Sequence, residues 1–285
     1  MFREAHLYVL HNSDDVQPYI EEHMTSLRIE NPSMTEKWII DKHNLSFIDW
    51  IRDRIIPLIG HFPTLIFETL HWLSQKPRYE VFQYTSYVIN GCTFYTKEQD
   101  GKSTMQNSGV TLVAEAMHVA SAKDKNPTYA DMNYYGVIEH IWELDYTVFK
   151  IPVFGCRWVD NGSGVRYEDG FTLVDLNRAG HKQDPFILAS QATQVFYVTD
   201  PADNRWSVVL STKKRNANEC DDENDANWNN ECVSAVQATQ LLNDDNNTIN
   251  EEEIYVRDDH REVIYVSDPK SNPKTRGKKR RKRRQ

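Results

Sequence analysis

The sequence lacks the residue patterns that mark common metal sites and phosphate-binding loops. Its four cysteines, Cys92, Cys156, Cys220 and Cys232, are too far apart to form a CxxC pair, which excludes a zinc ribbon or finger. It also contains no P-loop, no GxSxG and no HExxH motif. We therefore expect no metal, no cofactor and no small-molecule substrate, and we expect the chain not to be an enzyme.

Uninterrupted apolar runs are equally scarce. The most apolar stretch, residues 55–73, contains Pro57, Pro63 and Glu68, and two prolines with ionisable side chains argue against a membrane-spanning helix. The first residues carry charges at Arg3 and Glu4 and lack the apolar segment that a signal peptide requires. We expect free thiols in a reducing compartment and no membrane partner.

The net charge of −9 hides two segments of opposite sign. Residues 219–262 contain 14 acidic residues and 2 arginines, whereas residues 269–285 contain 10 basic residues and no acid. The acidic segment is rich in Asn and Asp and has too few apolar residues to offset the cost of ordering its backbone. The pattern predicts a disordered tail over residues 214–285, acidic first and then basic.

The first 75 residues read as helical. Val16, Ile20 and Leu27 belong to a stripe with spacings of three and four, and Asp14 and Asp15 are candidate N-caps. A second amphipathic run covers residues 38–55, and a short third helix is expected over residues 64–74.

Beyond Pro77 the pattern changes to β-branched and aromatic residues. Asn90-Gly91 between two such runs is a strong hairpin signal, which predicts a β-hairpin region over residues 79–120. About five short strands with turn signals follow over residues 134–213, beyond a polar linker at residues 121–131. The fold class expected is α+β: a helical N-terminal segment, a hairpin region, and a small all-β barrel or sandwich.

Three blocks carry a resemblance to a known family. They are residues 5–23, residues 87–96 together with 106–110, and residues 134–210. The sequence resembles the C-terminal part of plant transposases of the CACTA (En/Spm-like) class, over roughly residues 1–213. The third block resembles their transposase-associated domain of unknown function 4216. Residues 56–66 depart from the family pattern, as an insertion or a gene-model error would.

That resemblance implies a nuclear, transposon-derived protein. Proteins of this class carry a nuclease-like domain upstream of the matching region, and none of its metal-binding carboxylates can be carried over to this sequence. Glu139, Glu143 and Asp145 lie near one another in the sequence, but their spacing fits the polar faces of strands better than a metal site.

A set of aromatic residues in the β module has two interpretations. If exposed, they could line a groove that stacks bases or surrounds a methylated ammonium; if buried, they form the core. The set comprises Tyr134, Tyr135, Trp142, Tyr146, Trp158 and Trp206.

The basic end of the chain carries the clearest functional motif. It fits nuclear localisation or phosphate contact with DNA, and its alternative is a solvated tail without a partner. The residues concerned are Lys274, Arg276, Lys278, Lys279, Arg280, Arg281, Lys282, Arg283 and Arg284.

The sequence thus favours a non-catalytic nuclear protein that contacts DNA, chromatin or a transposase. Two alternatives stay open: a degenerate transposase fragment without selected activity, and a residual metal-dependent nuclease.

Overall fold

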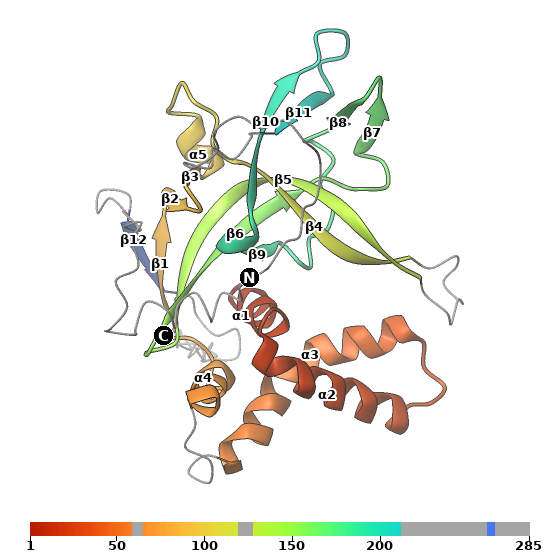
Figure 1. Cartoon of the computed structure of the whole chain (residues 1–285), viewed down its shortest axis with the longest axis vertical. Coiled ribbons are helices and arrows are strands. Elements are labelled where there is room, and N and C mark those ends of the chain that lie inside the picture. The colour runs from red at the N-terminus through yellow and green to blue at the C-terminus, as the bar shows by residue number, and fades with distance from the viewer. Residues whose placement is uncertain (59–64, 119–127, 212–260, 266–285) are drawn as a thin grey trace, which may run out of the picture.

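A computed structural model describes residues 1–58, 65–118, 128–211 and 261–265 of the chain (Figure 1). Four longer helices gather on one side of a large, mostly antiparallel sheet, as the sequence predicts for the N-terminal segment. No helix in these ranges is both long enough and apolar enough to cross a membrane.

The helical layer has bounds close to the predicted ones. Its helices are α1 (Phe2–His11), α2 (Gln17–Glu30), α3 (Glu36–Ile55) and α4 (Leu65–Ser74), with 3-10 turns η1 (Asp14–Val16) and η2 (Ile56–Leu58). The expected caps at Asp14 and Asp15 are wrong, because both residues lie within η1 and α2 begins after Val16 with a proline in its first turn. Thr35 caps α3 by accepting a hydrogen bond from the backbone N–H of Trp38.

One hydrophobic core joins this helical layer to the sheet. Val9 of α1 and Phe47 and Ile51 of α3 cluster with Trp142 and Val153 of the sheet, each at most 5% exposed. Burying such side chains contributes about 1.5–3 kcal/mol each. The helices are therefore held in place by the apolar face of the sheet.

The sheet consists of antiparallel pairs in the order β12-β1-β5-β4-β10-β11-β8-β7, with β6 pairing β5 and β9. A separate hairpin consists of β2 and β3. The bounds are β1 (Glu80–Tyr84), β2 (Ser86–Ile89), β3 (Cys92–Tyr95), β4 (Gly109–His118), β5 (Thr128–Asp145), β6 (Lys150–Trp158), β7 (Val165–Glu168), β8 (Phe171–Val174), β9 (Phe186–Leu188), β10 (Thr193–Thr199), β11 (Ser207–Ser211) and β12 (Arg261–Tyr265). Two short helical elements lie among them, α5 (Lys97–Asp100) and η3 (Ala189–Gln191).

The predicted closed barrel is wrong, because the sheet is open. Within the described residues β12 and β7 end the ladder and do not pair with each other. The long strand β5 pairs with β4 along all ten residues of β4 and with β6 along its other edge. Figure 1 shows the β4–β5 pair projecting well beyond the neighbouring strands. A ribbon of this length extends the sheet outward and does not close it.

The Asn90-Gly91 hairpin is confirmed. Both residues have positive φ, 52° and 68°, and connect β2 to β3 in register. The run predicted as one strand before this turn is divided at Thr85, because β1 pairs with β5 and β2 pairs with β3. The linker expected at 121–131 is also partly wrong, since β5 begins at Thr128; residues 119–127 lie outside the described residues.

A further hairpin connects β7 to β8 through Asp169-Gly170. These residues also have positive φ, 49° and 80°, as a type I′ turn requires. An Asp-Gly pair between two short β-prone runs is a local hairpin signal of the same kind as Asn90-Gly91.

Residues 261–265, inside the segment predicted to be disordered, form β12. Its backbone pairs with β1 from Glu80↔Tyr265 to Tyr84↔Arg261. The other residues of that predicted tail, from 212 to 260 and from 266 to 285, lie outside the described residues.

Candidate functional site

The aromatic residues expected to line a groove do not share one surface. Trp142 and Tyr146 lie in the core between helices and sheet, Trp158 lies in a second core cluster and Tyr135 in a third. All four are at most 8% exposed. The indole N–H of Trp142 donates to Gln83 Oε1 at 3.1 Å, which satisfies its one polar atom inside the protein. These four rings therefore serve packing.

Tyr134 and Trp206 are the two members that reach the surface in part. Tyr134 meets the rings of Trp158 and His181 edge-on, with centroids 6.4 and 5.0 Å apart, and partial burial raises the pKa of its phenol. The Arg166 guanidinium lies 4.3 Å from the centroid of the Trp206 ring and covers that face. Binding of a base or a methylated ammonium by either residue stays a prediction.

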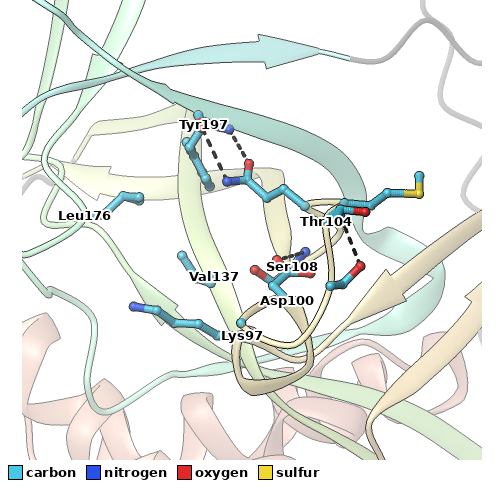
Figure 2. A pocket seen from close by; sticks show the side chains of 11 residues that line it. Lys97, Asp100, Thr104, Ser108, Val137, Leu176 and Tyr197 are labelled. Atoms are coloured by element: carbon cyan, nitrogen blue, oxygen red, sulfur yellow. Dashed lines mark hydrogen bonds between the residues drawn. The ribbon is translucent and has the colours of Figure 1, made fainter.

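A cavity of about 360 Å³ opens between α5, the loop that follows it, and strands β5 and β10 (Figure 2). No local sequence pattern predicted it, because its walls come from segments far apart in the chain. The side chains that define it include Lys97, Asp100, Ser103, Gln106, Val137 and Tyr197.

Asp100 braces one wall of this cavity. One carboxylate oxygen accepts the backbone N–H of Asn107 and the other accepts that of Ser108, both at 2.9 Å. The loop between them is therefore closed by charge-assisted hydrogen bonds. With both oxygens engaged, the carboxylate serves to shape the loop.

Gln106 connects the same loop to β10. Its side-chain carbonyl accepts the backbone N–H of Tyr197 at 2.6 Å, and its amide donates to the carbonyl of Tyr197 at 3.3 Å (Figure 2). The Tyr197 phenol donates toward the carbonyls of Gly136 and Val110, and burial raises its pKa. Since this phenol is committed to backbone acceptors, the cavity offers a ligand an ammonium at Lys97 and hydroxyls.

The three carboxylates weighed for a nuclease site are ion-paired along β5. Glu139 contacts Arg157 at 3.1 Å, Glu143 contacts Lys150 at 2.9 Å, and Asp145 lies 3.9 Å from Arg78. A rise of about 3.3 Å per residue separates Glu139 from Asp145 by roughly 20 Å along the strand. These carboxylates do not converge on one point.

Three histidines that sequence reasoning did not single out meet at the junction of α1, α2 and α3. His43 Nε2 lies 3.2 Å from His11 Nε2, and His43 Nδ1 lies 2.8 Å from His23 Nδ1. His23 Nε2 is 3.4 Å from Ser46 Oγ, whose hydroxyl donates to the carbonyl of Lys42. One chain of neutral tautomers satisfies every contact, with each imidazole donating once, from His11 to His43, to His23, to Ser46.

Burial keeps this histidine triad (His11, His23 and His43) neutral. It lowers the pKa of His43 to about 3, with further lowering by His11 and His23, and lowers the pKa of His11 to about 4. The pKa of His23 is lowered by burial and raised in part by Glu30. Across the described ranges, no group of three or more His, Cys, Asp or Glu side chains is arranged to hold a metal ion.

The basic residues proposed for nuclear localisation or phosphate contact, Lys274, Arg276 and residues 278–284, lie outside the described residues. Their nearest described neighbour is β12, which ends at Tyr265.

Part of the sheet matches a known family model. Residues 142–209 match the family model described as Domain of unknown function (DUF4216). The match runs from Trp142 in β5 to Val209 in β11, so it contains β6 to β10 and one wall of the cavity. Searches of curated proteins and of solved structures found no match. The domain match confirms the part of the resemblance that rested on the β module.

Proposed function

We propose that this chain is a non-catalytic accessory module of a CACTA-type transposon protein from a plant, acting in the nucleus and contacting DNA or chromatin through its basic segment. The observation that carries the proposal is the run of seven consecutive cations at residues 278–284 within a segment that has no acid. Runs of this kind serve nuclear import and bind phosphates with little sequence preference. The transposon origin rests on the resemblance of residues 1–213 to transposases of that class, in which the DUF4216 match to residues 142–209 is one part.

The folded part serves as a scaffold in this proposal. Its candidate acids on β5 are engaged in ion pairs, and the carboxylate of Asp100 holds backbone N–H groups. Its large aromatic residues are mostly in the core. These contacts favour a rigid support over a reaction centre.

Strand β12 sets how far the basic run can reach. Tyr265 ends β12 beside β1, and Lys278 begins the run 13 residues later, counted as 278 minus 265. A fully extended chain spans at most about 3.5 Å per residue, which gives roughly 45 Å. Lys278, the first cation of the run, would therefore lie within about 45 Å of the end of β12.

The test compares the full chain with a variant in which residues 278–284 are all replaced by glutamine. Binding to duplex DNA of arbitrary sequence is measured across a series of salt concentrations, and import is followed with a fluorescent fusion. A control replaces seven basic residues of the described part, among them Lys97, Lys102 and Lys182, which are exposed. Loss of binding and import in the tail variant alone supports the proposal; equal loss in both variants contradicts it.

A further inference from the structure

Among the described residues, strand β7 ends the sheet and has a strand partner on one edge only. Within the described part of the chain it pairs with β8 alone, through Glu168↔Phe171, Tyr167↔Thr172, Arg166↔Leu173 and Val165↔Val174. Tyr167 is 71% exposed, and the Glu168 side chain is 57% exposed. An edge of this kind is a ready template for another strand.

The hairpin turn fixes which backbone groups of β7 face outward. In a two-residue type I′ hairpin the pair that flanks the turn, here Glu168 and Phe171, exchanges both backbone hydrogen bonds. Because bonded and non-bonded pairs alternate, Arg166 also bonds to β8, whereas Tyr167 does not. The N–H and C=O of Tyr167 and Val165 therefore point away from β8, toward the free edge.

The side chains of β7 are self-complementary about Tyr167. Arg166 and Glu168 flank it on the other face of the strand, and they already form an ion pair with each other at 3.2 Å. Consider an antiparallel copy of β7 with Tyr167 opposite Tyr167. Arg166 of each copy then stands opposite Glu168 of the other, in non-hydrogen-bonded positions where side chains come closest.

Charge selects this register over its neighbours. Only shifts by two residues keep the outward-facing backbone groups opposite one another. One such shift places Arg166 opposite Arg166 of the second copy, and the other places Glu168 opposite Glu168. Like charges directly opposite are destabilising, so charge disfavours both of these neighbouring registers.

Apolar groups flank the new ion pairs. Across β8, the partner of Glu168 is Phe171, which is 55% exposed, and the partner of Arg166 is Leu173. Across the four strands of the joined sheet, four side chains would therefore lie side by side on one face. They are Phe171 and Glu168 of one copy, followed by Arg166 and Leu173 of the second copy. The guanidinium lies on this face, 4.3 Å from the Trp206 ring centroid and 3.9 Å from Asp200. Both residues are on the β11 side of β7, so pairing with Glu168 of a second copy requires the guanidinium to turn toward the outer edge of β7.

We propose that β7 is a homodimerisation edge, which joins two copies of this chain by two-fold antiparallel pairing centred on Tyr167. The contact is isologous, so it closes on itself and gives dimers and not filaments. Since the shared ladder is short, the dimer forms reversibly and in a concentration-dependent way.

A charge-reversal experiment on the full chain tests this directly. Sedimentation equilibrium is measured from low micromolar to submillimolar protein for the wild type, for Arg166→Glu and for Glu168→Arg. Each single variant places two like-charge pairs in the homodimer, and its dimer dissociation constant is expected to rise about tenfold or more. An equimolar mixture of the two variants restores both opposite-charge pairs, so it should dimerise about as well as the wild type.

A variant that removes a backbone donor tests the strand pairing without changing any charge. Tyr167→Pro deletes the outward N–H without touching a bond to β8, so the hairpin should persist while dimerisation is lost. Melting curves confirm that each variant is folded. A wild type that stays monomeric throughout, single variants that dimerise as the wild type does, or a mixture that fails to recover would each overturn the proposal.

Discussion

The side-chain amide of Gln106 pairs with the backbone of Tyr197 as a neighbouring strand would. The Tyr197 N–H donates to Gln106 Oε1 at 2.6 Å, and the Gln106 amide donates to the Tyr197 carbonyl at 3.3 Å. The ladder between β10 and β4 extends only over Thr193 and Gln194, so the side chain continues the pairing beyond the point where the strands part.

Replacing Gln106 with alanine should therefore destabilise the protein. It leaves the N–H and C=O of Tyr197 without their partner, at a cost of about 1–2 kcal/mol in the free energy of unfolding. Urea unfolding followed by circular dichroism measures the change. Gln183→Ala, at an exposed glutamine, serves as control and should shift the free energy by less than about 0.5 kcal/mol. Equal effects of the two substitutions would contradict the role given to Gln106.

Gly109 should not tolerate a side chain. A Cβ at this position would stand 2.2 Å from the carbonyl oxygen of Val195, a backbone atom that cannot move aside alone. Gly109→Ala is expected to destabilise the fold by about 2–3 kcal/mol through overpacking where β4 meets β10. Gly162→Ala is the matched control, because its Cβ would come no closer than 3.7 Å to Asp160. Thermal melts of both variants test the difference, and a Gly109→Ala protein as stable as the control would contradict it.

The buried histidines predict a loss of stability in mild acid. Burial, with Lys76 and Arg3 nearby, lowers the pKa of His6 to about 3, and the pKa of His43 is also about 3. The unfolded chain binds protons on these groups below about pH 6.5, before the folded protein does. The contribution of these neutral histidines to the free energy of unfolding is thus complete above about pH 6.5 and falls as the pH drops toward 3.

Each such histidine contributes a slope of about 1.4 kcal/mol per pH unit within that window. Urea unfolding at a series of pH values measures the total slope. His43→Gln and His6→Gln should each reduce this slope by about 1.4 kcal/mol per pH unit, the contribution of one histidine. A slope that either substitution leaves unchanged would show that the imidazole is not held neutral.

Two tryptophans should respond differently to truncation. Trp142 is 5% exposed and belongs to the core between helices and sheet, so Trp142→Ala should cost about 3–5 kcal/mol. Trp206 is only partly buried and stacks on Arg166, so Trp206→Ala should cost about 1 kcal/mol. Denaturant unfolding of both proteins gives the comparison. Similar costs for the two would contradict the assignment of Trp142 to the core and Trp206 to the surface.

Local sequence signals predicted what depends on neighbours in the chain. The Asn90-Gly91 turn and the helical periodicity of the first 75 residues are local, and the structure confirms both. Asp169-Gly170 is a turn signal of the same kind and connects β7 to β8.

Other features depend on segments far apart in the sequence. Whether the sheet closes is decided by the length and pairing of β5 and by the partners of its end strands. The pairing of β12 with β1, and the meeting of His11, His23 and His43 on three different helices, also have no local pattern. The four buried aromatic residues have the composition of a binding surface, and only the packing assigns them to the core.

The salt dependence of DNA affinity tests the central claim most directly. If the seven cations at residues 278–284 neutralise phosphates, the logarithm of the affinity of the full chain should fall against the logarithm of salt with a slope of about −6. The glutamine variant of residues 278–284 should bind weakly, and its slope should be shallower by about 6, leaving only what Lys274 and Arg276 contribute. A slope that is the same in both proteins would contradict the account, because contact with nucleic acid would then not depend on the basic run.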